Sequence, residues 1–297
     1  MARRSPLVCL VAVVTCLLCV SPAAASFPRQ PPSIRFMRID SDFELWRMRA
    51  DGTRVRRVTS NTVNDSDARV SPNGSRLVFA RQPVGELDDE IYTMWSDGTH
   101  VRRLTDNTFR DETPNWSPDG TRIVFRSNRN DSQIDLYTMD PDGTDIDRTT
   151  NTSGLEWLPT WSPDGDWIAF SLDQVGADFE VAKVRSGGGS TQLVTNNQGI
   201  EDLTADWAPS GARLAIWSDT DGDFEIFTIL PDGTGRRQLT HNGVDDINAF
   251  WLPVVGRIAF NRFVGEDREI FTIRTNGTGV RRLTTNVVED YLVRTLN

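Results

Sequence analysis

Two short sequence markers recur along almost the whole chain at intervals of 44 to 46 residues. One is a turn dipeptide, found as Asp51-Gly52, Asp97-Gly98, Asp142-Gly143, Gly187-Gly188, Asp232-Gly233 and Asn276-Gly277. The other is a bulky residue followed by a proline-containing turn, and it starts at Val70, Trp116, Trp161, Trp207 and Trp251. A regular period of this length is typical of proteins that repeat one supersecondary unit. The sequence therefore predicts six similar units in a single domain.

Each unit contains four strand-like pieces separated by turns. In the second full unit they are residues 114–117, 122–125, 135–139 and the segment that follows Asp142-Gly143 and ends at Thr150. Glycine in these turns supplies the positive φ that a tight hairpin needs. We find no useful helical period beyond the first 25 residues. Four-stranded antiparallel units repeated six times predict an all-β fold, the six-bladed β-propeller.

The two ends of the chain make complementary parts of one unit. Residues 34–37, 44–48 and 55–59 match a second, a third and a fourth strand, while residues 290–295 match a first strand. We therefore expect one blade to be built from both termini, which closes the ring without an unpaired inner edge.

The N-terminus has the features of a cleaved secretory signal. Arg3 and Arg4 precede an apolar stretch over residues 7–20, and small residues end at Ala25. This pattern predicts a signal peptide at 1–25 and a mature propeller at 26–297, exported to the periplasm or the medium. All three cysteines lie inside the predicted signal: Cys9, Cys16 and Cys19. The mature protein should therefore contain neither a disulfide nor a thiolate metal site.

Charge narrows the classes of partner. The chain has a formal net charge of -10. Such a chain repels nucleic acid and anionic lipid surfaces. We expect a protein partner, no nucleic acid, no membrane insertion and a monomeric state. Arginine pairs such as Arg56-Arg57 and Arg102-Arg103 fall on fourth strands, where charge at an exposed edge discourages edge-to-edge pairing.

The repeat resembles the WD40-like (PD40) repeat of the TolB family of propellers. The resemblance rests on Leu104-Thr105, on the string from Thr113 to Thr121 and on residues 134–139, and it extends over essentially the whole mature chain. It implies a soluble periplasmic protein that binds a protein partner at the propeller mouth. We expect the propeller alone, without the α/β domain that precedes it in TolB.

Two columns of carboxylates keep the register of the repeat. The first precedes each first-strand marker by five residues: Asp65, Asp111, Glu156, Asp202, Asp246 and Asp290. The second lies at the start of each third strand: Glu44, Glu90, Asp135, Glu180, Glu225 and Glu269. The direction of the strands places both columns on one face, with the first column nearest the central channel.

Two interpretations of the columns remain open at this point. Each acid can accept backbone hydrogen bonds or pair with an arginine, which would make the columns structural. Alternatively, the first column forms an acidic ring at the channel mouth that binds a basic protein or a cation such as calcium. The segment from Asp219 to Glu225 superficially resembles a calcium loop. However, Phe224 and Leu230 occupy the positions where an EF-hand needs Gly and Glu, so we expect a tight turn.

No catalytic motif stands out in the sequence. We find no nucleophile elbow, zinc-protease motif, dinucleotide fingerprint or phosphate loop. We therefore predict a non-enzymatic binding platform that acts through its acidic channel mouth, with no cofactor, calcium being the alternative. Two further alternatives stay open. One is a carbohydrate-active or other hydrolytic enzyme that uses channel carboxylates from different blades, and the other is a structural component of the cell envelope.

Overall fold

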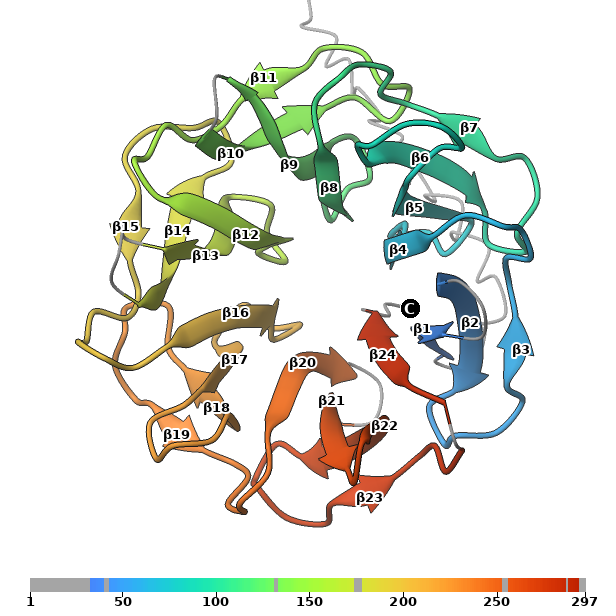
Figure 1. Ribbon diagram of the computed structural model, residues 1–297. Coiled ribbons are helices and arrows are strands. Elements are labelled where there is room, and N and C mark those ends of the chain that lie inside the picture. The colour runs from blue at the N-terminus through green and yellow to red at the C-terminus, as the bar shows by residue number, and fades with distance from the viewer. Residues whose placement is uncertain are drawn as a thin grey trace, which may run out of the picture.

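The computed structural model describes residues 33–39, 43–130, 133–173, 178–252, 256–286 and 288–293. These residues form six four-stranded antiparallel sheets arranged as blades around a central axis (Figure 1). The prediction of a six-bladed β-propeller is confirmed. Among the described residues there is no helix long and apolar enough to cross a membrane. The predicted signal peptide, 1–25, lies outside the described residues.

The blades follow one another along the chain. Blade 1 contains β24 (Asp290–Val293), β1 (Ser33–Ile39), β2 (Phe43–Arg49) and β3 (Arg56–Arg57). Blade 2 contains β4 (Asp65–Val70), β5 (Arg76–Arg81), β6 (Glu90–Trp95) and β7 (Arg102–Arg103). Blade 3 contains β8 (Asp111–Trp116), β9 (Ile123–Asn130), β10 (Gln133–Met139) and β11 (Asp147–Arg148). Blade 4 contains β12 (Leu155–Trp161), β13 (Trp167–Asp173), β14 (Phe179–Arg185) and β15 (Gln192–Leu193). Blade 5 contains β16 (Asp202–Trp207), β17 (Leu214–Ser218), β18 (Glu225–Ile229) and β19 (Arg237–Gln238). Blade 6 contains β20 (Asp246–Leu252), β21 (Arg257–Val264), β22 (Asp267–Arg274) and β23 (Arg281–Arg282).

Blade 1 closes the ring with strands from both ends of the chain. The red strand β24 lies beside the blue strand β1 in Figure 1. The two strands are antiparallel, in a register that runs from Arg35 opposite Val293 to Arg38 opposite Asp290. The predicted closure is therefore confirmed, and β1 has a partner on each side.

The hydrophobic core lies between neighbouring blades. Second strands are apolar on both faces, as in Leu77-Val78-Phe79, where each residue is 0% exposed. Val78 packs with Trp116 and Ile123 of the next blade, whereas Leu77 and Phe79 pack with blade 1. Each blade is thus a buried layer between two others, which explains why these strands do not alternate between apolar and polar residues.

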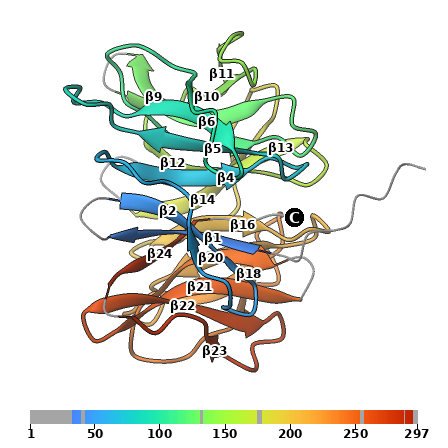
Figure 2. The same ribbon diagram turned by 90° about the vertical axis from the view of Figure 1, so that its right-hand side faces the viewer.

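The disc has two distinct faces, seen edge-on in Figure 2. We call the side that carries the starts of the first strands the mouth face, and the side that carries the Ser-Pro-Asp-Gly and Asp-Gly turns the turn face. Glycine is needed in these turns for more than conformation. Gly98 has φ of 92°, and a Cβ at this position would lie 2.3 Å from the carbonyl oxygen of Val58 in blade 1. The turns of one blade therefore rest directly on the backbone of the preceding blade.

Candidate functional site

The six predicted ring carboxylates all lie at the starts of first strands on the mouth face. Each of Asp65, Asp111, Glu156, Asp202, Asp246 and Asp290 is 0% exposed. The structure therefore places them beneath the surface of the channel mouth. Whether a partner reaches this ring stays a prediction.

Five of the six ring carboxylates bind an arginine of their own blade. In blade 2, Arg81 stands opposite Asp65 and donates from Nε and Nη2 at 2.6 and 2.9 Å. Two more blades repeat this bidentate pair, Arg262 with Asp246 and Arg38 with Asp290. In the remaining two blades, a serine stands opposite the ring carboxylate. The ion pair is made instead by an arginine from elsewhere in the blade: Arg129 pairs with Asp111, and Arg236 pairs with Asp202.

The second column is buried as well, and it is linked to the first across five of the six blade boundaries. Glu44 accepts hydrogen bonds from the hydroxyl of Thr59 and from the backbone N–H of Asn61, the latter at 2.7 Å. The Asn61 side chain then donates to Asp65 of the next blade at 2.8 Å. Equivalent asparagines at four other boundaries are Asn107, Asn197, Asn242 and Asn286. At these five boundaries the acid of the second column thus helps to fix the acid of the following blade.

The fourth-strand arginines also belong to these networks. Arg57 donates to Glu44 at 2.6 Å, and Arg103 donates to Glu90 at 2.8 Å. Equivalent pairs join Arg148 to Asp135 and Arg282 to Glu269. In the edge pairs Arg56-Arg57, Arg102-Arg103 and Arg281-Arg282 the second arginine therefore turns inward and pairs with a carboxylate, whereas in Arg236-Arg237 the first arginine does so.

Glu156 is the exception among the ring carboxylates. Leu172 stands opposite it, and no ion pair to Glu156 is found within the described part of the chain. At this boundary the two acid types are swapped. The second column has the shorter Asp135 where the other blades have glutamate, and the first column has the longer Glu156 where the other blades have aspartate. The longer Glu156 side chain accepts from the backbone N–H of Leu136 at 3.0 Å, from the Thr152 hydroxyl at 2.7 Å and from the Thr150 hydroxyl.

Burial without a cation raises the pKa of Glu156 from 4.5 to about 7, and the charge of Asp135 adds to the effect. The folded protein then binds a proton that the unfolded chain has released, so this stabilisation is complete below pH 4.5 and is lost as pH rises through about 7. We expect Glu156→Gln to match the wild type at pH 4 and to be more stable by about 3 kcal/mol at pH 8.5. Chemical denaturation across this pH range measures the difference.

The control for this experiment is Asp166→Asn, which changes an exposed carboxylate on the turn face. It should leave the dependence of stability on pH as it is in the wild type. Parallel pH profiles for Glu156→Gln and the wild type would contradict the assignment of the proton to Glu156.

The first strands of blades 2 to 6 carry a bulge just after the ring carboxylate. The register shifts there in blades 2 to 6, and four of the bulged residues have positive φ: Asp67, Thr113, Leu158 and Asn248. A bulge bends the strand and re-aims its side chains.

A second group of charged side chains surrounds Glu112 of blade 3. The Arg126 guanidinium lies 3.7 Å from the centre of the Trp157 ring and donates to Glu112 at 2.5 Å. Burial, followed by the charge of Glu112, raises the pKa of Asp89 to about 6.

An acidic cluster on the mouth face contains no arginine. It comprises Asp173 at the end of β13 and the loop residues Asp178, Glu201 and Asp219 of blades 4 and 5. Asp178 accepts from the backbone N–H of Ile200 at 3.1 Å, and Asp219 accepts from that of Glu201 at 2.7 Å. Burial raises the pKa of Glu201, and the charges of Asp219, Asp178 and Asp173 raise it further. No ion pair joins these four carboxylates to any other residue that the structure describes.

Comparison with known proteins agrees with this architecture. The family model of the TolB beta propeller domain matches residues 36–205, which is more than half of the chain. The chain belongs to the TolB β-propeller family. A search of curated proteins found no match.

Solved structures extend the likeness of this TolB-family propeller, at the level of fold alone. TolB from Acinetobacter baumannii has a TM-score of 0.77 and 17% identity, over 88% of this chain and 65% of that chain. The protein assigned as TolB of Agrobacterium tumefaciens has a TM-score of 0.70 and 17% identity, over 89% of this chain and 91% of that chain. Oligogalacturonate lyase from Vibrio parahaemolyticus has a TM-score of 0.55 and 13% identity, over 89% of this chain and 72% of that chain. The chain thus spans slightly less than two thirds of the Acinetobacter TolB.

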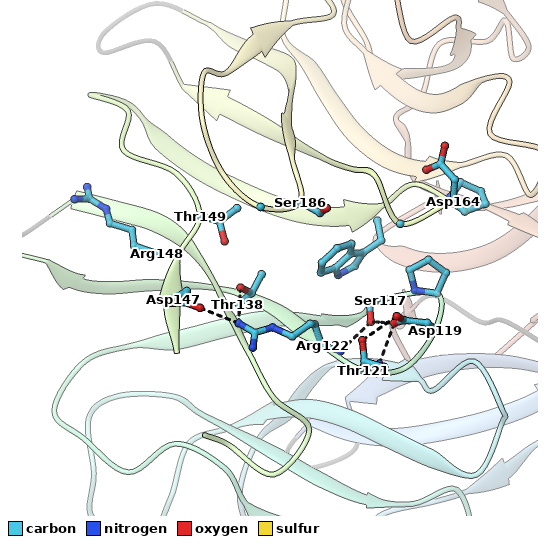
Figure 3. Close-up of a pocket in the computed structure, with 15 residues that line it drawn as sticks. Ser117, Asp119, Thr121, Arg122, Thr138, Asp147, Arg148, Thr149, Asp164 and Ser186 are labelled. Carbon is cyan, nitrogen blue, oxygen red and sulfur yellow. Dashed lines mark hydrogen bonds and ion pairs between the residues drawn. The ribbon is translucent and has the colours of Figure 1, made fainter. Parts of the chain in front are cut away.

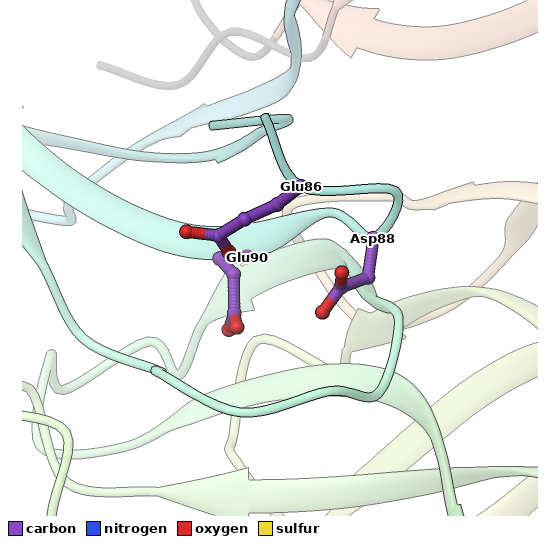
Figure 4. Close-up of side chains that lie close together, drawn as sticks. All are labelled: Glu86, Asp88 and Glu90. Atoms are coloured by element: carbon purple, nitrogen blue, oxygen red, sulfur yellow. The ribbon is translucent and has the colours of Figure 1, made fainter. Parts of the chain in front are cut away.

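A separate trio of carboxylates in the TolB-family propeller has the spacing of a cation site. Glu86, Asp88 and Glu90 offer oxygen atoms within 4.8 Å of one another, on or beside the loop between β5 and β6 (Figure 4). Arg103 already pairs with two of them, donating to Glu86 at 2.9 and 2.7 Å and to Glu90 at 2.8 Å. A guanidinium therefore supplies positive charge to this trio.

The segment from Asp219 to Glu225 forms the predicted tight turn, in which Gly222 N–H donates to the Asp219 carbonyl at 3.0 Å.

Sequence reasoning missed the residues that link the two columns. The recurring signal was available, because asparagine precedes the ring acid by four residues at Asn61, Asn107, Asn242 and Asn286. A polar residue kept at one register of a repeat, beside a kept acid, is typical of a hydrogen bond between them. The acidic cluster of blades 4 and 5 has no such signal, because it is not repeated.

Proposed function

We propose that this TolB-family protein is an exported, non-enzymatic binding platform in the periplasm or medium that engages a protein partner through the acidic mouth face. The observation that carries the proposal is the acidic cluster of blades 4 and 5, whose carboxylates lack arginine partners among the described side chains. A carboxylate whose pKa is raised by neighbouring carboxylates, as that of Glu201 is, gains from a nearby cation. A basic surface on a partner protein would supply this positive charge. The negative field of the cluster would also steer such a partner toward the mouth face.

In this proposal the ring carboxylates and the loop carboxylates have different tasks. The ring acids Asp65, Asp111, Glu156, Asp202, Asp246 and Asp290 hold the mouth loops in place through their buried hydrogen bonds. The loop acids meet the partner. Trp157 and Leu155 are exposed beside the cluster and provide apolar area for contact.

The hydrolytic alternative has one feature in its favour. Asp89 and Glu112 lie close together, and the pKa of Asp89 is raised to about 6. A carboxylic acid beside a carboxylate is the pairing that acid–base catalysis uses. However, Arg126 and Arg110 already surround Glu112, so we favour the binding platform.

A pull-down from the native envelope fraction tests the proposal. The triple variant D173N/E201Q/D219N removes three negative charges, while each amide oxygen can still accept the same hydrogen bonds. We expect the wild type to retain a partner whose binding falls about tenfold in the triple variant and also falls as salt is raised. Quantitative mass spectrometry of the retained proteins measures both effects.

The matched control is Asp166→Asn on the turn face, which should retain the partner as well as the wild type does. A partner that binds the wild type and the triple variant equally at low salt would contradict the acidic cluster as the binding surface. If the wild type retained no protein whose binding falls as salt is raised, the proposed role as a binding platform would be contradicted.

A further inference from the structure

Blade 1 departs from the repeat on the turn face. Equivalent positions can be counted from the acid of the second column, Glu44 in blade 1 and Asp135 in blade 3. The backbone confirms the equivalence, because Arg49 N–H donates to the Thr53 carbonyl at 2.7 Å and Asp140 N–H donates to the Thr144 carbonyl at 2.8 Å. The two blades can therefore be compared residue by residue.

In blade 3 a single arginine is surrounded by carboxylates. Arg122 donates to Asp140 at 2.9 Å, to Asp145 at 2.5 Å and to Asp147 at 3.3 Å. Figure 3 shows Arg122 with Asp147 and Thr138 in the groove between blades 3 and 4. The charge of Arg122 is therefore compensated by carboxylates of its own blade.

Blade 1 carries the inverse arrangement. Ser33 stands where blade 3 has Arg122, and the positions of its three aspartates are taken by Arg49, Arg54 and Arg56. Arg54 has φ of 56° at a turn position where blades 5 and 6 have glycine, Gly235 and Gly279. Compared with blade 3, the single arginine is therefore replaced by a serine, and the three aspartates are replaced by three arginines.

Two further arginines of blade 1 stand where the other blades have at most one charged residue, which is Lys183 opposite Ala169 in blade 4. Arg35 and Arg47 lie directly opposite each other in β1 and β2. The same pair is Val78 with Thr93 in blade 2, Val124 with Thr138 in blade 3, and Ala259 with Thr272 in blade 6. Like charges directly opposite on a sheet are destabilising. A function rather than the fold must account for this pair, since the other blades fold without it.

Arg35 is held deep in the blade with donors to spare. Its side chain is 4% exposed, its Nη1 donates to the Ser33 hydroxyl at 2.8 Å, and its Nε has no partner among the described atoms. Burial, and after it the charge of Arg47, lowers the pKa of Arg35 to about 10. Within the described residues, none of the five arginines of this groove forms an ion pair.

The five arginines line one cavity. It has a volume of about 550 Å³ and lies between blade 1 and the turns of blade 2, where Gly74, Ser96 and Asp97 complete its wall. Asp97 is the single carboxylate in that wall, and it already accepts from the backbone N–H and hydroxyl of Thr99. The volume is that of a small-molecule site rather than a protein interface. In a chain of net charge -10, so many unpaired arginines around one cavity point to an anionic ligand.

We propose that the groove between blades 1 and 2 binds a phosphate-bearing anion, with Arg35 and Arg47 at its base and Arg49, Arg54 and Arg56 at its rim. A phosphate group presents several oxygens and up to two charges, which suits guanidinium forks that approach from different strands. Its arrival would neutralise the opposed pair Arg35 and Arg47 and satisfy the free donor of Arg35. The bound anion would therefore stabilise the fold as well as fill the site.

The double variant R35V/R47T tests the proposal, because it restores the pair that blade 2 has at this register. Inorganic phosphate and pyrophosphate are titrated by calorimetry and by thermal shift, with ionic strength held constant by sodium chloride. We expect saturable binding to the wild type and a rise in Tm. The double variant should bind phosphate at least about tenfold more weakly than the wild type. In the absence of phosphate, the double variant should have the higher Tm of the two proteins.

The control R110T/R185T removes the same charge from two exposed arginines outside the groove and should bind phosphate like the wild type. Sedimentation with phosphatidylcholine vesicles that contain phosphatidic acid distinguishes a lipid phosphate from a free one, and the double variant should lose whichever interaction is seen. Equal binding by the wild type and R35V/R47T, or no saturable binding of any of these probes, would overturn the proposal.

Discussion

Deleting residues 290–297 should abolish cooperative folding of the propeller, or lower its Tm by more than any single substitution. The deletion removes β24, and with it the antiparallel partner of β1. It also strips Asp290 from the Arg38 guanidinium, which it binds at 2.7 and 2.9 Å, and the Asp290 carbonyl from the side chain of Asn261. Leaving one buried ionic partner alone costs about 3 to 5 kcal/mol, and the open edge of β1 adds to that.

The loss would be comparable with the whole stability of an ordinary domain. Thermal denaturation followed by circular dichroism measures it. A synthetic peptide that spans residues 288–297 provides the control, because it should restore Tm in a concentration-dependent way if the missing strand is the cause. An unchanged Tm after the deletion would show that the ring does not depend on this closure.

The ring carboxylates should differ sharply in what their neutralisation costs. Asp65→Asn leaves the Arg81 guanidinium, which donates to Asp65 at 2.6 and 2.9 Å, without its counter-charge in a buried site. We expect a loss of about 3 to 5 kcal/mol in the free energy of unfolding at pH 8. Glu156→Gln, an equally small change in the next-but-one blade, should instead stabilise the protein at that pH, because no cation depends on Glu156. Denaturant unfolding of the two variants side by side measures the contrast.

A second paired acid serves as the control. Asp246→Asn should behave like Asp65→Asn, since Arg262 binds Asp246 in the same bidentate way at 2.6 Å from both nitrogens. If Asp65→Asn and Glu156→Gln shifted stability equally, burial alone would explain the ring and the ion pairs would be unimportant to it.

The sequence predicted the architecture well because a repeat reports the same structure six times. The interval between turn dipeptides predicted the number of blades, and the surplus strand at 290–295 predicted how the ring closes. The register of both carboxylate columns followed from the same count. Periodicity of this kind averages over local exceptions, which is why it is reliable for the fold.

The same averaging limits what the sequence says about the site. Spacing predicts where Asp65 lies on a strand, but not that Arg81 lies over it and that its carboxylate is fully buried. The replacement of an opposite arginine by Ser127, with Arg129 reaching back to Asp111, depends on side-chain length and packing. The charge inversion around Ser33 is visible in the sequence only once the structure fixes which residues are equivalent. Exceptions to a repeat therefore carry the functional information that the repeat itself hides.

The position of β24 in the chain also orders events in the cell. It is the last strand of the propeller to leave the ribosome, although its place is beside β1, the earliest strand. Until then the nascent protein can only be an open arc, with β1 lacking its inner neighbour. The emergence of β24, rather than the folding of any one blade, is thus the moment at which the molecule can become a rigid ring.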